Sequence, residues 1–196
     1  MQLFPKTLIL ALTSSLVSFS ALAQTDAEMI AQAVLPLPEE LRADATVFRY
    51  DAETGERIVL RQGINQVECQ PRAENGFTRC GPTVEGPRRD MQAKLRAEGM
   101  SDEEVDAALA RAEAMGHIKG RAFGALNYRL YDHDDRIQLL WIVSVPNATS
   151  EQLGYPTGSQ RDNSLAGKGT PWMMREGTPG AHLMIPVNGT PLSNQP

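Results

Sequence analysis

The sequence has few residues of the kinds that build metal or redox centres. Its 196 residues include two cysteines and three histidines, and 6% are aromatic. Cys69 and Cys80 are not in the C-x-x-C spacing of thiol–disulfide exchange proteins, which argues against that class. An oxidising compartment would instead pair them as a structural disulfide that closes a twelve-residue loop. A loop of this size contributes roughly 3 kcal/mol to stability by restricting the unfolded chain.

Sequence motifs of hydrolases and of phosphate-binding enzymes are also absent. The chain contains no Gly-x-Ser-x-Gly elbow and no His-Glu-x-x-His helix. Residues 167–170 come near the order of a phosphate-binding loop but lack its strand-to-helix context, and the segment 154–169 around them is expected to be a surface loop. Because a catalytic triad can be assembled from distant residues, these absences leave the enzyme hypothesis open. No cofactor is indicated.

Long apolar runs are missing after residue 23, whereas a membrane span takes roughly 20 such residues. Residues 1–23 are typical of a cleavable signal peptide, with Lys6 as the positive end, residues 8–19 as the apolar core and Ala23 at the end of a small–x–small site. Cleavage is predicted between Ala23 and Gln24. No cysteine follows the cleavage site, which argues against a lipoprotein, and the lack of a twin-arginine pair favours the general secretory route.

The mature chain is mildly acidic. Removal of the predicted signal peptide takes away one lysine and no acidic residue, so the formal net charge changes from −5 to −6. An acidic surface argues against nucleic acid as a partner, because phosphate binding needs basic side chains. We therefore expect a soluble periplasmic or secreted protein with no membrane span after cleavage, whose partner is a small ligand or another envelope protein. The sequence does not indicate an oligomeric state.

The pattern of apolar and turn residues predicts a single α+β domain over residues 44–187. A helical lead-in over 24–43 precedes it, and a flexible tail over 188–196 follows it. Within the domain, strands are predicted at 46–50, 57–61, 66–69, 122–131, 137–145, 171–175 and 182–187, with a helical hairpin at 88–116. Because hairpins rather than crossovers link the strands, we expect an antiparallel sheet of about five to seven strands. The inserted helical hairpin would lie on one face or protrude.

The helical hairpin carries the clearest local signals. Gly99 and Gly116 are placed to end its two helices, and Ser101 with Glu104 forms a capping box at the start of the second helix. That helix also carries an apolar stripe, made of Val105, Ala108, Leu109, Ala112 and Met115. Such a stripe packs against the protein's own sheet more often than against a partner.

One cluster of metal-ligand residue types lies at the expected tip of a β-hairpin, at Asp132, His133, Asp134 and Asp135. Its oxygen atoms suit a hard cation, and His133 favours a transition metal. The spacing fails the calcium-loop pattern, however, and aspartate is common in solvated turns. The sequence thus favours a turn over a metal site.

The last predicted hairpin brings together Met173, Met174, His182 and Met184. His182 and Met184 are two residues apart, so they share one face of a strand. Thioether and imidazole groups suit Cu(I), but methionine also fills gaps in protein cores, and no Met-rich or His-rich repeat accompanies the set. A core role is favoured, with a copper site at His182 and Met184 as the alternative.

Two functions stay open from these residues. The first is a non-catalytic binding or accessory protein of the cell envelope, favoured by the export signal, the predicted disulfide and the lack of a catalytic motif. The second is a periplasmic hydrolase with His182 as the general base and with Trp172 and Arg175 as its pocket neighbours. A serine or carboxylate within hydrogen-bond reach of His182 would favour the enzyme.

Two stretches near the C-terminus, residues 169–174 and 177–187, both begin with Gly-Thr-Pro, and the second contains a GTP-x-AH-x-M type of stretch. Together with residues 43–47, 60–65 and 69–71, they resemble a group of exported bacterial proteins with no assigned function. The likeness covers both ends of the mature chain but not the predicted helical hairpin. It implies a bacterial, envelope-located protein and no particular activity, cofactor or catalytic residue.

Overall fold

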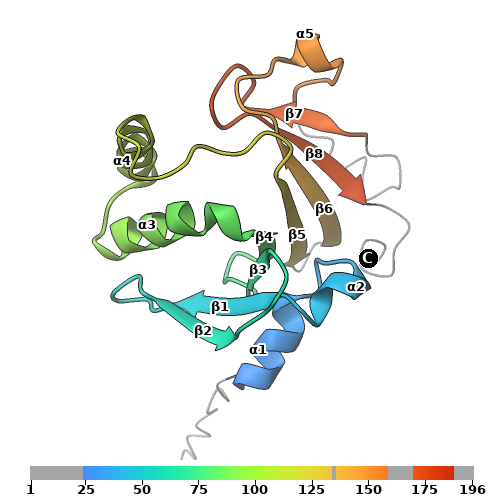
Figure 1. Ribbon diagram of the computed structural model, residues 1–196. Helices are drawn as coiled ribbons and strands as arrows, with labels where there is room; N and C mark the ends of the chain where they lie inside the picture. Colours follow the sequence, from blue (N-terminus) through green and yellow to red (C-terminus); the bar gives the residue numbers. More distant parts are fainter. Residues whose placement is uncertain (1–23, 134–135, 159–169, 188–196) are drawn as a thin grey trace, which may run out of the picture.

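The computed structural model describes residues 24–133, 136–158 and 170–187. The predicted signal peptide with its cleavage after Ala23, the residues Asp134 and Asp135, and the predicted tail 188–196 lie outside the described residues. The helices are α1 (Asp26–Ala33), α2 (Glu39–Arg42), the short 3-10 turn η1 (Thr83–Glu85), α3 (Gly86–Ala97), α4 (Asp102–Ala114) and α5 (Ser150–Leu153). The strands are β1 (Thr46–Tyr50), β2 (Arg57–Arg61), β3 (Val67–Gln70), β4 (Phe77–Pro82), β5 (Leu126–His133), β6 (Arg136–Ser144), β7 (Trp172–Met174) and β8 (His182–Val187). Figure 1 shows their arrangement.

The strands of the described chain form one mixed sheet of eight, in the order β2-β1-β3-β4-β5-β6-β8-β7. β1 and β3 run parallel, and the other neighbours run antiparallel. The α+β class predicted from the sequence is confirmed. The predicted antiparallel sheet of five to seven strands is wrong in two respects, because the sheet has eight strands and one pair is parallel.

The additional strand is β4, which occupies a segment predicted as part of the disulfide loop. It pairs with β3 on one side and with β5 on the other. Gly81 and Pro82 lie at its end and are typical of turns, so the local pattern did not indicate a strand. The register places Cys69 directly opposite Cys80, and their sulfur atoms are bonded, as predicted.

The parallel pair arises from the way the chain leaves β2. Gly63 passes so close to the start of β1 that a Cβ atom there would overlap the backbone of Asp44 and Ala45. The amides of Ile64 and Asn65 donate to the carbonyl oxygen of Asp44, at 2.9 Å and 3.1 Å. The chain therefore crosses the end of β1, and β3 pairs with the side of β1 that β2 leaves free.

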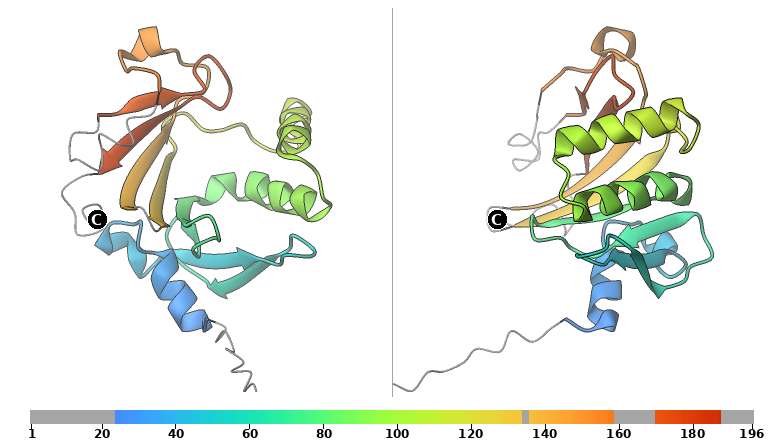
Figure 2. Two further views of the ribbon diagram at one scale, coloured as in Figure 1. Left: turned by 180° about the vertical axis from the view of Figure 1, so that it is seen from behind. Right: turned by 90° about the vertical axis from the view of Figure 1, so that its left-hand side faces the viewer.

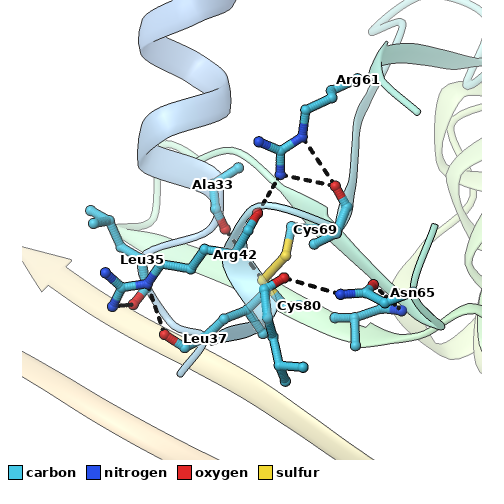
Figure 3. The surroundings of a disulfide bond; sticks show 11 residues. Ala33, Leu35, Leu37, Arg42, Arg61, Asn65, Cys69 and Cys80 are labelled. Carbon is cyan, nitrogen blue, oxygen red and sulfur yellow. Dashed lines mark hydrogen bonds between the residues drawn. A yellow bond between two sulfur atoms is a disulfide. The ribbon is translucent and has the colours of Figure 1, made fainter. Parts of the chain in front are cut away.

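The disulfide lies beside the chain that links α1 to β1, and two arginines hold that link in place (Figure 3). Arg42 donates to the carbonyl oxygens of Leu37 and Leu35, at 2.9 Å and 3.3 Å. Arg61 donates to the carbonyl oxygens of Arg42 and Ala45, at 2.6 Å and 2.9 Å. These bonds satisfy carbonyl groups of an irregular segment that would otherwise be buried without donors.

The sheet is strongly curved, with helices on both of its faces (Figures 1 and 2). α1 and α2 pack on the outer face, whereas α3 and α4 lie inside the curve. The buried core of the outer face consists of Ala33, Val34, Leu37, Ala45, Val47, Cys69, Cys80 and Tyr128. The inner face carries many charged side chains instead, and these form the site described below.

The predicted helical hairpin is formed by α3 and α4 and lies inside the curve of the sheet (Figure 2). The hydroxyl of Ser101 accepts a hydrogen bond from the amide of Glu104, and the carboxylate of Glu104 accepts one from the amide of Ser101, which confirms the capping box. Four of the five predicted stripe residues are buried. Met115 is 68% exposed instead, because it caps the end of α4.

Candidate functional site

The inner face of the sheet and the two long helices enclose a pocket of about 310 Å³. Side chains of α3, α4, β5 and the turn between β7 and β8 line this pocket. Figure 1 shows where these elements lie. Its charged lining residues are Glu85, Arg88, Arg89, Asp106, Arg121, Arg129 and Arg175. Five cations thus face two anions across this pocket.

Gly81 on β4 leaves room for polar side chains at the pocket floor. A Cβ atom at this position would collide with the side-chain oxygen of Asn127 and would approach Nη1 of Arg89 to 3.0 Å. Side chains of a strand alternate between faces, so Asn127 and Arg129 of β5 point inward while Tyr128 joins the outer core. The sequence of β5 therefore places polar groups on the floor.

A network around Glu68 fixes α3 against the sheet. The Glu68 carboxylate is 6% exposed and pairs with Arg57 at 2.9 Å and with Arg89 at 2.6 Å. Arg57 also pairs with Asp90 of α3 at 2.7 Å, and the Tyr50 hydroxyl donates to Asp90 at 2.7 Å. Burial, with the hydrogen bond to Asp90, raises the pKa of Tyr50 well above its usual range. Each of these charged groups has a partner, as buried charges require.

Two further ion pairs shape the rim of the pocket. Arg88 of α3 pairs with Glu113 of α4 at 2.8 Å. Arg175, in the turn after β7, pairs with Asp106 of α4 at 3.0 Å. The backbone of Arg175 has a φ of 55°, in the left-handed region that non-glycine residues rarely adopt. This conformation, together with the ion pair, positions the Arg175 side chain at the rim.

Arg129 and Arg121 differ from the other pocket arginines. Neither has a hydrogen bond or an ion pair with any residue that the structure describes. Arg129 is partly buried at the floor and stands directly opposite Arg79 of β4, whose buried Nε also has no partner in the described chain. Burial, followed by the charges of Arg79 and Arg121, lowers the pKa of Arg129 to about 10. It is therefore protonated at neutral pH among like charges.

Glu85 adds an acceptor that is also unmatched. Its Oε2 lies 3.4 Å from Nη1 of Arg89. Its Oε1 is buried and has no hydrogen-bond partner within residues 24–133, 136–158 and 170–187. A buried water or a donor on a ligand would satisfy such an atom.

His182, the residue that the sequence singled out as a base, lies on β8 beside the pocket but outside its lining. Its Nδ1 is 2.8 Å from the carbonyl oxygen of Gly180. Burial lowers the pKa of His182, the bond to Gly180 opposes this, and the charges of Arg129 and other pocket arginines lower it further. Ser144 is its cross-strand neighbour but is only 1% exposed. In the described part of the chain, no serine or carboxylate hydrogen-bonds to His182.

The methionines of the last hairpin divide between the two faces of the sheet. Met173 is buried in the core of one face, and Met184 packs against Trp172 and two aliphatic side chains on the other. Met174 lies opposite His182 and is exposed. His182 and Met184 follow the alternation that the sequence predicted, and the apolar surroundings of Met184 fit the core role better than a copper site.

Of the predicted acidic cluster, the structure describes the first two residues, Asp132 and His133. The backbone carbonyl of Asp132 accepts a hydrogen bond from Arg72 at 2.6 Å, and its carboxylate lies 3.9 Å from Nε of Arg72. His133 ends β5, while Asp134 and Asp135 lie outside the described residues. Among the residues that are described, no group of three or more His, Cys, Asp or Glu side chains could hold a metal ion.

Comparison with protein-family models, curated proteins and solved structures gave no match. The family resemblance suggested by the two ends of the chain therefore stays a prediction. The geometry of the pocket is what indicates a function.

Sequence patterns did not indicate Arg121 and Arg129, the two pocket arginines that have no partner among the described residues. Arg121 and Arg129 come from a loop and a strand, and their pocket neighbours come from two helices and a distant turn. Whether an arginine has a partner depends on these distant segments. The available local signal was the alternation of polar and apolar residues along β5.

Proposed function

We propose that this protein is an exported, non-catalytic binding protein of the cell envelope that holds a small ligand in the inner-face pocket. The supporting observation is a pocket of about 310 Å³ whose charged lining is held by ion pairs. Small-molecule sites are clefts of roughly 300–1,000 Å³ in which a few polar groups fix the ligand. The pocket lies at the lower end of that range, which suits a ligand of metabolite size.

The walls of the pocket are held in position without a ligand. Arg89 ties α3 to Glu68 of β3 at 2.6 Å, and Arg88 ties α3 to Glu113 of α4 at 2.8 Å. Side chains that are already ordered lose little conformational entropy when a ligand arrives. Such preorganisation favours a binding role.

The alternative, a hydrolase centred on His182, has less support. A nucleophile needs a hydrogen-bonded base and access to substrate. Ser144 is the serine opposite His182, but it is 1% exposed, and no hydrogen bond joins the two within the described chain. The Trp172 ring packs in an apolar cluster, and Arg175 is engaged by Asp106. These contacts favour binding over catalysis.

Export is part of the same proposal. The Cys69–Cys80 disulfide is compatible with an oxidising compartment. No helix within the described residues is long and apolar enough to cross a membrane. A periplasmic or secreted location follows from the predicted signal peptide, and mass spectrometry of the mature N-terminus would test it, with Gln24 expected as the first residue.

Native mass spectrometry of the protein purified from its own cell envelope tests the binding role. We expect a bound small molecule whose mass is lost when the protein is denatured. Absence of any ligand, in both this preparation and a thermal-shift screen of metabolites, would refute the proposal.

Two alanines of α4 offer a matched pair of variants. Ala110 lines the pocket, whereas Ala107 lies outside the lining, and both are exposed. Ala110→Trp should fill the pocket and remove the bound mass, and Ala107→Trp should retain it. Equal ligand retention by both variants would place the ligand elsewhere and contradict the proposal.

A further inference from the structure

We infer that the ligand of this pocket is an anion, with its charged oxygens against Arg129 at the floor and Arg121 at the mouth. This inference rests on the binding role proposed above and specifies the chemistry of the ligand. A carboxylate and a phosphate share the chemistry that the pocket would recognise.

The charge pairing within the pocket points to this class of ligand. Arg88, Arg89 and Arg175 each have a carboxylate partner within 3.0 Å. Arg129 and Arg121 have none among the residues described. The charges that act on Arg129 most strongly are those of Arg79 and Arg121, which are both positive. Among the described residues, no carboxylate therefore acts strongly on Arg129, whereas Arg121 also has the charges of Glu85 and Asp106 nearby.

The placement of Arg129 beside other positive charges is unfavourable when no anion is bound. Like charges directly opposite each other on neighbouring strands repel, and Arg79 and Arg129 occupy such a pair of positions. A partly buried guanidinium group without a partner also keeps a desolvation cost that no ion pair offsets. An anion bound at Arg129 would relieve both costs.

The same face of the sheet provides an internal comparison. Arg57 of β2 and Arg89 of α3 also point into the curve, and each donates two hydrogen bonds to Glu68. These two arginines thus have carboxylate partners from the protein itself. Arg79 and Arg129 have none among the described residues, and of these two Arg129 is the one that lines the pocket. A planar guanidinium group can bind a carboxylate or phosphate through two parallel hydrogen bonds.

The rest of the lining limits the size and shape of the anion. Leu109, Ala110 and Pro179 give the lining of the pocket an apolar side. A small organic acid or phosphate ester would place its charged group at Arg129 and its carbon skeleton along this side.

Titration calorimetry at low ionic strength tests the inference with three probes: succinate, inorganic phosphate and succinamide. The wild type should bind succinate or phosphate and should not bind the neutral amide; whichever anion binds more tightly identifies the preferred group. Arg129→Met should weaken the anion at least about tenfold, since a charge-assisted hydrogen bond contributes that much. Arg121→Met should weaken it less, because Arg121 is exposed.

Arg111→Met is the matched control, because Arg111 is an exposed residue of α4 outside the pocket lining. It should bind the anion as the wild type does. The urea midpoint of ligand-free Arg129→Met should be higher than that of the wild type, so weak binding by this variant cannot be ascribed to misfolding.

Three results would overturn the inference: no binding of either anion by the wild type, equal binding of succinamide and succinate, or unchanged affinity in Arg129→Met. A neutral ligand found by native mass spectrometry would also overturn it while leaving the binding role intact. Equal retention by the two α4 tryptophan variants would instead place the ligand outside this pocket and refute the proposed binding site.

Discussion

Arg57 and Glu68 form a two-pronged ion pair on the inner face of the sheet, with Nη1–Oε2 and Nη2–Oε1 distances of 2.9 Å and 3.1 Å. Glu68 also accepts from Arg89 of α3, so one buried carboxylate joins two guanidinium groups. The Arg57 guanidinium lies 3.7 Å from the centre of the Phe48 ring. The pair therefore links the charged inner face to the packing of β1 and to the position of α3.

Glu68→Gln is expected to lower the free energy of unfolding by about 3 kcal/mol, because it removes the buried charge shared by two guanidinium groups and leaves Arg57 with Asp90 and Arg89 with the more distant Glu85. Urea denaturation measures this change. Glu53→Gln, at an exposed position in the β1–β2 turn, is the control and should have little effect. A loss below about 1 kcal/mol for Glu68→Gln would mean that the network does not anchor α3.

Arg129→Met should stabilise the ligand-free protein at neutral pH, and that advantage should depend on pH in a defined direction. The pKa of Arg129 is about 10 in the folded state and has its higher, ordinary value in the unfolded chain. Below pH 10 both states carry the charge, so the folded state bears its full cost. Above pH 10 the unfolded chain binds more protons, so the stability of the wild type rises relative to the variant.

Urea titrations of both proteins between pH 7 and pH 11 would measure this difference. The advantage of Arg129→Met should be constant up to about pH 9 and should shrink above pH 10. An advantage that grows with pH would have the wrong sign for an unpaired cation.

The pKa of His182 is expected to change when an anion binds in the pocket. Burial lowers its pKa, and the charges of Arg129, Arg121 and Arg175 lower it further. An anion bound beside those arginines reduces the positive potential, so the pKa of His182 should rise when the pocket is filled. NMR titration of the imidazole with and without saturating succinate or phosphate measures the shift.

The exposed His117 provides an internal reference for general salt effects in the same spectra. Arg129→Met should raise the pKa of His182 without any anion, because it removes one of the positive charges. If the added anion leaves His182 unaffected in the wild type, the anion binds away from these arginines.

Removal of the disulfide by replacing both Cys69 and Cys80 with alanine should lower the free energy of unfolding by roughly 3 kcal/mol. The reason is the greater freedom of the unfolded chain. Denaturation of the wild type with and without reductant gives an independent measure of the same quantity. Agreement between the double variant and the reduced wild type would assign the loss to the cross-link rather than to the alanine side chains.

Local sequence signals placed most elements of the fold. The bounds of β1, β2 and β8 agree with the predicted strands residue for residue. Alternation and turn residues defined them, and glycines with a capping box defined the helical hairpin. The parallel pairing of β1 with β3 could not be predicted in this way, because it depends on how closely Gly63 approaches Asp44 across the end of β1.

The residues of the candidate site were harder to predict from the sequence than the helices and strands. His182 and the methionines have chemically distinctive side chains, which a sequence pattern can indicate. Arg129 is a common residue type, and its lack of a partner is a property of the folded chain as described. The pairing of Arg89 with Glu68 and of Arg88 with Glu113 shows the same dependence, because each pair joins separate elements.

The place of the disulfide in the strand order has a mechanical consequence. β3 and β4 are the third and fourth of eight strands, so the bond links the β2-β1-β3 part of the sheet to the part that begins with β4. Under a pulling force applied at the two ends of the chain, the load passes through the sulfur–sulfur bond, and residues 70–79 cannot extend. Reduction would release this segment and add roughly 35 Å to the stretched length. The oxidised protein is therefore a shorter tether than its reduced form.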